Sequence, residues 1–267
     1  MRIPFYWVDA FTSRAFAGNP AGVCPLSEWV PDDALQAIAK ENNLSETAYF
    51  VPKALARDEY ELRWFTPEME VDLCGHATLA SGKVVLDEMQ AGGGSVRFHS
   101  RSGPLVVTRS GERFELDFPS QPGELLDPTS TPRFEALLGS CPTEVLRSVS
   151  YDMAIFDTQS QVASLAPDEG LLLAHDALAV IATAPGDAAD VDFVSRFFAP
   201  QAGVFEDPVT GSAHCVMTPY WAQRLGQATL RARQISARGG ELWCTQRGDR
   251  VGIAGHAVLY MRGAITL

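Results

Sequence analysis

The first half of the chain is dominated by short runs in which apolar and polar residues alternate. These runs are rich in β-branched and aromatic residues, and they read FYWVDAF, TAYFVP, YELRWF, VRFHS, PLVVTRS and RFELDFP. A period of two predicts strands of a mixed or antiparallel sheet. Two segments have helical spacing instead, 33–41 and 76–89, and the second ends before the turn-forming Ala91-Gly92-Gly93-Gly94. We therefore expect strands wrapped on few helices.

After residue 119 the pattern changes to SQPGELLDPTSTP, which is rich in turn formers and poor in apolar periodicity. Such a stretch is typical of a connection between domains. We predict domains at 1–119 and 120–267, with a C-terminal tail that can pack back on the first. In the second domain the pattern predicts strands at 153–157 and 177–183, a short helix at 191–198, a longer helix at 213–225 and a strand-rich tail from 228.

A weak internal echo links the two halves. Phe65-Thr66-Pro67-Glu68 precedes a helix that opens near Gly75, and Phe198-Ala199-Pro200-Gln201 precedes one that opens near Gly211. A glycine-bearing turn at a helix start leaves backbone N–H groups unpaired in front of the positive end of the helix dipole, so it can bind an anion. Either glycine alone is more often a relief of backbone strain, and Ser212 a simple helix cap. The matching pair favours a carboxylate site.

Composition narrows the class of protein. The chain has 267 residues, 46% hydrophobic and 20% charged, which is typical of a globular protein with a buried core. A net charge of −12 argues against nucleic acid and membrane surfaces as partners. Five scattered cysteines and a start without a secretory signal indicate reduced thiols in the cytoplasm. Phosphate-loop and dinucleotide motifs and paired metal-ligand spacings do not occur, so we expect neither a cofactor nor a metal.

Three groups of motifs carry a family resemblance. They are FTSRAFAGNPAGV with NLSETAYF (11–23, 43–50), RWFTP with DLCGHAT (63–67, 72–78), and FEDPVTGSAH (205–214). Together they resemble the signature blocks of the phenazine-biosynthesis-like (PhzF) family, from about residue 3 to the end and least at 120–147. The resemblance implies a diaminopimelate-epimerase-like α/β (α+β) fold of two similar domains. Each would be a curved barrel-like sheet around a central helix, with the site in the cleft between them.

The resemblance also implies roles for individual residues. The catalytic residues would be Glu46 as general acid/base, His76 and Asp207. The substrate would be bound by Asn19, Gly75, Ala77, Gly211, Ser212 and Ala213. The family's members are often homodimers, and they use no cofactor or metal.

The chemistry of these residue types agrees with those roles. A carboxylate in a partly dry site can take a proton from carbon and deliver it elsewhere, and fixed N–H groups after Gly75 and Gly211 could stabilise the carbanion or enolate between the two steps. His76 would contact the substrate or orient Glu46, and Asp207 would position an ammonium or hydroxyl group. We expect an isomerase that moves a proton within a small carboxylate-bearing substrate.

Other interpretations stay open. Cys74 and Cys215, one in each echo segment, could act as two bases of a racemase or epimerase, or both could be small buried residues. Glu46 could be a solvated strand end, His76 a helix cap and Asp207 a turn opener. A small-molecule binding protein with the same fold and no chemistry is the third possibility.

Overall fold

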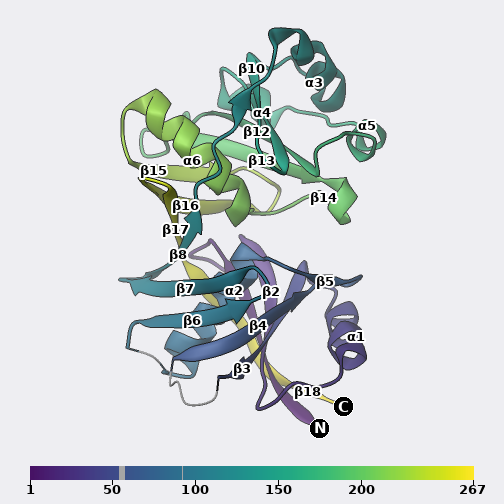
Figure 1. The fold of residues 1–267 in the computed structure, drawn as a ribbon, viewed down its shortest axis with the longest axis vertical. Coiled ribbons are helices and arrows are strands. Elements are labelled where there is room, and N and C mark those ends of the chain that lie inside the picture. Colours follow the sequence, from purple (N-terminus) through teal and green to yellow (C-terminus); the bar gives the residue numbers. More distant parts are fainter. Residues whose placement is uncertain (54–57, 92) are drawn as a thin grey trace. The chain divides into compact units, whose positions relative to one another are not determined.

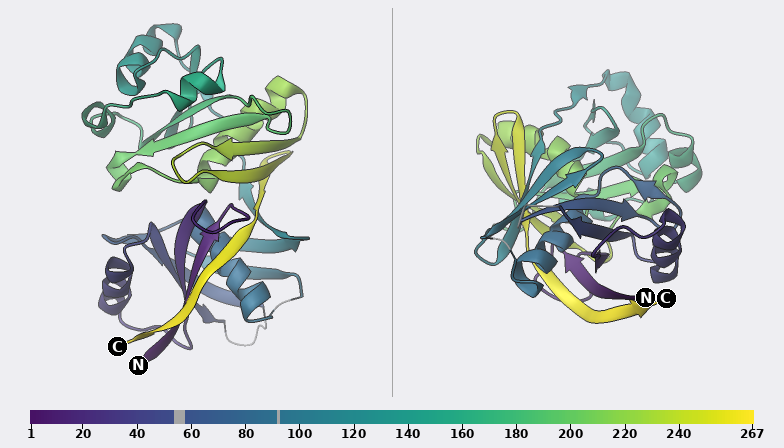
Figure 2. Two further views of the ribbon diagram at one scale, coloured as in Figure 1. Left: turned by 180° about the vertical axis from the view of Figure 1, so that it is seen from behind. Right: turned by 60° about the horizontal axis from the view of Figure 1, so that its bottom comes forward.

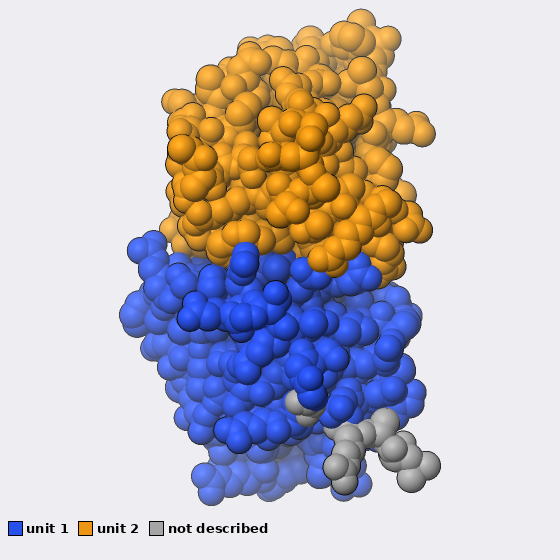
Figure 3. Space-filling model, turned by 90° about the vertical axis from the view of Figure 1, so that its left-hand side faces the viewer, with its two compact units in different colours: residues 1–117, 254–267 blue, residues 118–253 orange. Residues whose placement is uncertain are grey.

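The computed structural model describes residues 1–53, 58–91 and 93–267, so Gly92 of the predicted turn lies outside it. The chain forms two compact units, residues 1–117 with 254–267 and residues 118–253 (Figure 3). It enters the second unit within β8 (Arg113–Pro119) and returns within β17 (Arg250–Gly255). The C-terminal segment 254–267, which the prediction allows to pack back on the first domain, groups with residues 1–117.

The first unit is built on one continuous series of paired strands (Figure 1). The order is β18, β1, β2, β3, β4, β6, β7, β8, with parallel partners only at β2–β3 and β4–β6, while the short β5 pairs back on β4. All six predicted strand runs are confirmed as β1, β3, β4, β6, β7 and β8. The bounds are β1 (Arg2–Ala10), β2 (Asn19–Pro25), β3 (Glu46–Pro52), β4 (Glu59–Phe65), β5 (Glu70–Val71), β6 (Ser95–Ser100), β7 (Gly103–Ser110) and β18 (Ala257–Thr266).

β18 runs beside β1 for almost its whole length. The register carries Arg2 opposite Thr266 and Ala10 opposite Ala257, with one bulge. The terminal N–H₃⁺ of Met1 donates to the carbonyl of Leu267 at 2.6 Å. The two ends of the chain therefore meet, as Figure 2 shows.

Helix α2 (Gly75–Lys83) is enclosed by the strands of the first unit. It contacts β1, β2, β3, β7 and β18, and every residue from 76 to 82 is buried. Mostly small side chains let a helix fit inside a curved sheet, and the helix continues as the π-helix η1 (Val84–Glu88). The other predicted helix is α1 (Asp32–Asn42), which packs on the far side through Leu35, Ile38 and Ala39. Both predicted helices of this half are confirmed.

Gly82 is the point where α2 presses on β7. A Cβ at this position would lie 2.4 Å from Cγ1 and 2.7 Å from Cβ of Val107. Alanine favours a helix over glycine by about 1 kcal/mol, but overpacking of a core typically costs about 1–3 kcal/mol, and here the Cβ would meet two atoms of Val107 at less than van der Waals distance. We expect Gly82→Ala to lower the free energy of unfolding in urea, whereas Gly93→Ala, with open space around its Cβ, leaves it unchanged. Equal stability of the two variants would contradict this packing.

The second unit repeats the strand order of the first. Its series is β9, β10, β11, β12, β13, β15, β16, with parallel partners only at β11–β12 and β13–β15 and the short β14 on β13. Helix α6 (Gly211–Leu225) lies between β14 and β15 in the chain, as α2 lies between β5 and β6. The bounds are β9 (Glu124–Leu125), β10 (Glu144–Arg147), β11 (Tyr151–Ile155), β12 (Ala179–Pro185), β13 (Phe193–Ala199), β14 (Val204–Glu206), β15 (Thr229–Gln234) and β16 (Gly240–Arg247).

The predicted helix at 191–198 is wrong, because this segment forms β13. It lies between β12 and β15 and is buried on both faces, so its apolar residues do not alternate. A run without alternation cannot be told from a buried helix by period alone, although its aromatic and β-branched residues favour a strand. The predicted connection holds more structure than expected, because η2 (Pro128–Ser130) and the start of α3 (Thr131–Leu138) lie in it. Further along the second unit, the additional short helices are α4 (Gln159–Ala163), α5 (Glu169–Leu173) and η3 (Pro200–Ala202).

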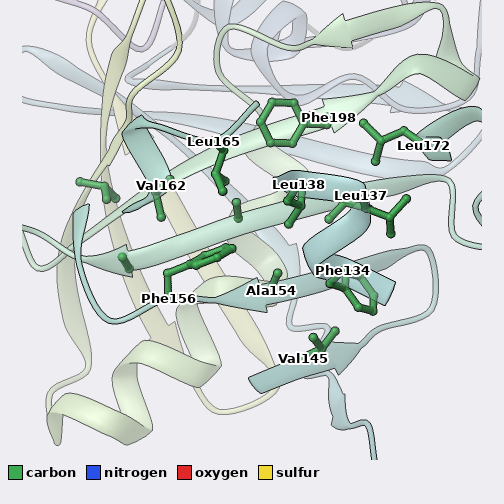
Figure 4. Close-up of a cluster of buried hydrophobic side chains, with 14 of the residues drawn as sticks. Phe134, Leu137, Leu138, Val145, Ala154, Phe156, Val162, Leu165, Leu172 and Phe198 are labelled. Atoms are coloured by element: carbon green, nitrogen blue, oxygen red, sulfur yellow. The ribbon is translucent and has the colours of Figure 1, made fainter. Parts of the chain in front are cut away.

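Each unit has its own apolar core. In the second unit side chains from α3, β10, β11, β12 and β13 pack together, among them Phe134, Phe156 and Phe198 (Figure 4). In the first unit a cluster around Phe5, Leu35 and Tyr49 joins α1 to the sheet. Among the residues that the structure describes, none of the helices has the length and apolar character that a membrane crossing requires.

The echo between the halves extends to a pair of arginine clamps. Arg63 on β4 binds both carboxylate oxygens of Glu70 on β5, at 2.7 and 2.8 Å, and its guanidinium lies 5.1 Å from the ring of Phe65. Arg196 on β13 binds Glu206 on β14 in the same way, at 2.8 and 2.9 Å, and lies 4.9 Å from the ring of Phe198. The segments that precede α2 and α6 are therefore held by the same arrangement, an arginine paired with a glutamate beside a phenylalanine ring.

Candidate active site

Glu46 is the first residue of β3 and is not a solvated strand end. Helix α1 is terminated by Asn43 in the left-handed conformation (φ 49°), and the chain then enters β3 with Glu46 in register with Ala21 of the parallel strand β2. Only 19% of the Glu46 side chain is exposed. The preceding Ser45 donates through Oγ to Oδ1 of Asn19 at 3.3 Å. Asn19, a predicted substrate-binding residue, therefore lies beside this corner and is fully buried.

His76 brings a second functional group to Glu46. Its Nε2 lies 3.0 Å from Oε2 of Glu46, and both atoms are buried. The contact is close but poorly aligned, so neither atom has a hydrogen-bond partner of normal geometry among the described residues. A buried polar atom without a partner costs about 1–3 kcal/mol and calls for an explanation such as a ligand or a catalytic role. His76 does not cap the helix, because its ring faces Glu46 and Cys74.

Cys74 completes a cluster of three groups. It precedes α2 in the N-cap position with extended backbone (φ −145°, ψ 111°), and Sγ makes no capping hydrogen bond, although the N–H of Ala77 faces it and acts to lower its pKa. Sγ lies instead 3.5 Å from Nδ1 of His76. Burial, with the charge of Glu46, raises the pKa of the thiol to about 11. Cys74 is therefore a neutral thiol near pH 7.

The pKa of His76 is displaced upward. Burial acts to lower it, but negative charge at Cys74 and Glu46 and the close contacts of the ring with both side chains outweigh burial and hold the pKa well above its ordinary value. Because the Cys74 thiol is uncharged near pH 7, the Glu46 carboxylate is the anion that stabilises the imidazolium there. The cluster thus places the carboxylate of Glu46, which can act as a base, beside the imidazole of His76, which can carry a proton.

The same three residues form a group that could hold a metal, since one ligand atom from each lies within 4.8 Å of the others. The close contacts do not converge on one point, because Cys74 faces Nδ1 while Glu46 faces Nε2. An ion binds only one nitrogen of a histidine ring. The geometry therefore fits a hydrogen-bonded series better than a metal centre, and the absence of a metal stays a prediction.

Asp207 lies in the second unit, in the turn before α6. Oδ2 of Asp207 accepts a very short hydrogen bond from the Thr210 hydroxyl, and its carbonyl accepts one from Gln234 at 2.7 Å. Oε1 of Gln234 also accepts the N–H of Thr210, the N-cap residue, at 2.9 Å. Asp207 does help to shape the turn, as a turn opener would. Its half-buried carboxylate is also held in a fixed direction.

The expectation that Ser212 caps its helix is wrong. The helix begins at Gly211 and its N-cap is Thr210, so Ser212 is the second helical residue. Its hydroxyl lies 3.0 Å from the hydroxyl of Tyr151 on β11. Burial raises the pKa of Tyr151, so the phenol stays protonated and can donate. Tyr151 was missed because nothing in its local sequence marks it, and only the fold brings it beside α6.

The remaining predicted residues occupy the first turns of the two central helices. Gly75 and Ala77 open α2, and Gly211 and Ala213 open α6. Their N–H groups belong to the unpaired set at a helix start, as expected for an anion site. Cys215 also lies in α6 and is buried.

Comparisons with known proteins agree with this picture. A model of the family described as phenazine biosynthesis-like protein matches residues 8–263. The chain is 50% identical over 268 residues to an uncharacterized isomerase of Pseudomonas aeruginosa, with both chains fully covered. The crystal structure of a PhzF family protein from Enterococcus faecalis is 45% identical and matches both whole chains with a TM-score of 0.95.

A more distant structure shows the fold alone. A probable proline racemase from Agrobacterium radiobacter is 11% identical, covers 99% of this chain and 93% of its own, and has a TM-score of 0.63. The predicted α/β epimerase-like fold class is confirmed. On these matches over nearly its whole length, the chain belongs to the phenazine biosynthesis-like (PhzF) family.

Proposed function

We propose that the protein is an isomerase that moves a proton within a small carboxylic acid, with Glu46 as the general acid/base. The observation that carries this proposal is the pair of buried atoms, Oε2 of Glu46 and Nε2 of His76, 3.0 Å apart and without aligned partners. A carboxylate poised beside a proton-carrying imidazole is suited to proton abstraction from carbon. The printed name of the P. aeruginosa relative, an isomerase, supports the same class of reaction.

The start of α2 supports a carboxylate-bearing substrate. Its first N–H groups lack intrahelical partners, and the positive end of the helix dipole stands behind them. The buried, unpartnered Nε2 of His76 belongs to this same turn. An anionic group bound here would place the adjacent carbon within reach of Glu46, and the same donors would stabilise the negative charge that develops on proton removal.

Asp207 and Ser212 are proposed as binding groups. Asp207, fixed by Thr210, is suited to an ammonium or hydroxyl group, and Ser212 with Tyr151 offers two hydroxyl donors. The roles of Asp207 and Ser212 follow from the family resemblance, and that of Tyr151 from its contact with Ser212. Asp207→Asn and Ser212→Ala test them kinetically. A homodimer and a cytoplasmic location likewise stay predictions.

The two-thiol alternative requires one of Cys74 and Cys215 to act as a thiolate base while the other, as a thiol, returns a proton. The raised pKa of Cys74 and its contact with Nδ1 of His76 argue against its use as a base. This alternative predicts that Cys215→Ala abolishes proton exchange, while the glutamate mechanism predicts that Cys215→Ala retains it.

The proposal is tested by hydrogen exchange in heavy water. The protein is incubated with a panel of small 2-amino and 2-hydroxy carboxylic acids in D₂O, and loss of carbon-bound protons is followed by ¹H NMR. We expect deuterium to enter at least one acid, at a carbon next to a carboxylate or along a conjugated chain from it. An acid that binds, as seen by saturation transfer, but is never labelled would identify a binding protein instead.

A further inference from the structure

The imidazole of His76 faces a different group with each of its nitrogens. Nδ1 lies 3.5 Å from Sγ of Cys74, and Nε2 lies 3.0 Å from Oε2 of Glu46. The three side chains therefore form a series of thiol, imidazole and carboxylate, with the ring in the middle. Cys74 is the outer member, and it reaches Glu46 only through His76.

Hydrogen bonds to its backbone fix the position of Cys74 at the start of α2. Its carbonyl accepts both the N–H of Thr78, at 3.2 Å, and the Thr78 hydroxyl, at 2.6 Å. An N-cap residue usually turns its side chain toward the free N–H groups of the helix. Here Sγ makes no capping bond of normal geometry, and the thiol, which is 6% exposed, contacts the imidazole instead. The Cys74 thiol therefore contacts the His76 ring while it also faces the N–H of Ala77.

The hydrogen on Nε2 follows from this arrangement. If the S–H donates to Nδ1, a neutral ring must carry its hydrogen on Nε2. If the ring is an imidazolium, both nitrogens carry hydrogen. The remaining form has a bare Nε2, whose lone pair would face the Glu46 carboxylate at 3.0 Å and be repelled by it. Both favoured forms direct an N–H at Glu46.

We propose that Cys74 is a positioning residue, which holds the His76 ring through Nδ1 so that Nε2 keeps its hydrogen toward Glu46. This inference rests on the proposed function, in which Glu46 is the base, and it assigns to Cys74 and His76 the task of orienting that base. An N–H directed at the carboxylate holds Glu46 in one orientation before the substrate is bound. A ring that already carries hydrogen on Nε2 also cannot remove the proton that Glu46 takes from carbon. The proton then stays on Glu46 for delivery to the substrate.

The test reads the hydrogen positions on His76 directly. In ¹⁵N-labelled protein, long-range ¹H–¹⁵N spectra distinguish the tautomers of a histidine ring, and His76→Gln assigns its signals. We expect the wild type to hold hydrogen on Nε2 whenever the ring is neutral. Cys74→Ala removes one of the two groups that favour hydrogen on Nε2 and leaves Glu46, so it should weaken this preference and raise the share of the other tautomer. Cys74→Ser, which keeps an O–H donor, should restore much of it. Cys24→Ala removes a buried thiol from β2 and should leave the His76 signals unchanged.

A His76 spectrum that is the same in Cys74→Ala and in the wild type would overturn the inference. This readout needs no substrate, so it fails or succeeds independently of the proton-transfer reaction. With a substrate from the exchange panel, we expect Cys74→Ala to lower kcat roughly tenfold, the size of one hydrogen bond, with little change in KM. Unchanged kcat together with unchanged tautomers would reduce Cys74 to a packing residue.

Discussion

Glu46→Gln is expected to lower proton transfer by about 10²- to 10⁴-fold, the range for loss of a general acid/base. Glutamine has nearly the shape of glutamate but cannot accept a proton from carbon at neutral pH. The measurement is the rate of deuterium incorporation into the acid that the wild type labels. Because the change removes chemistry rather than binding, kcat should fall far more than the affinity for the substrate.

The fold should survive this change. Glutamine keeps the size of the side chain, and Oε2 of Glu46 has no aligned hydrogen bond to lose, so the cost in stability is limited to the lost attraction between the carboxylate and the His76 ring. Glu41→Gln makes the same replacement on the exposed side of α1 and serves as the control with unaltered exchange. Retention of most activity by Glu46→Gln in a folded protein would contradict the assignment of the base.

Asp152→Ala is expected to cost the second unit about 3 kcal/mol of stability, the lower end for breaking a buried ion pair. Asp152 is fully buried on β11 and binds Arg147 at 2.7 and 2.8 Å and Nε2 of His175 at 2.8 Å. Arg133 donates to the other nitrogen of His175 at 3.0 Å, so the ring must donate to Asp152. Because the Arg147 side chain is 42% exposed, solvent screens part of the pair.

The control for this variant is Asp176→Ala. Asp176 pairs with Arg133 at 3.2 Å, but its side chain is 65% exposed. Surface pairs contribute roughly 0–1 kcal/mol, so urea unfolding should separate the two variants clearly. If Asp152→Ala does not fold, Asp152→Asn, which keeps the shape, gives the same comparison. Equal midpoints for the variants at positions 152 and 176 would refute a stabilising role of the network.

The contribution of Asp152 should depend on pH. Burial alone would raise its pKa, but hydrogen bonds from Arg147 and His175 outweigh burial and hold the pKa below its ordinary value. The unfolded chain therefore takes up a proton near pH 4 while the folded protein is still ionised. The stability that Asp152 provides is complete above that pH and is lost as the pH falls through the folded pKa. The stability difference between wild type and Asp152→Asn should narrow accordingly.

Much of the fold could be predicted from local patterns, and the failures have a common cause. Strands with one exposed face, such as β6 and β8, alternate and were recognised. β13, buried on both faces, does not alternate and was mistaken for a helix. Short helices such as α3 lie in a segment whose turn-forming residues masked its one apolar face. The periodicity of apolar residues reflects which faces of an element are exposed. It therefore does not identify a strand that is buried on both faces or a short helix that buries only a narrow face.

The candidate site was predictable only in part. The family motifs identified Glu46 and His76, which the structure brings together, and the echo around Gly75 and Gly211 anticipated two helix starts with the same approach. The link from Cys74 to His76 and the contact of Tyr151 with Ser212 depend on rotamers and on strand register. Neither leaves a periodic trace in the sequence.

The return of the C-terminal strand has a consequence for how the protein forms during synthesis. Residues 118–253 are contiguous, so the second unit is complete before translation ends. The first unit, by contrast, needs β18 beside β1, and residues 257–266 leave the ribosome only after the whole of the second unit. Although domains generally fold in the order in which they emerge, here the later one can mature first. Until β18 has been synthesised, one edge of β1 in the amino-terminal half therefore lacks the strand that covers it in the folded protein.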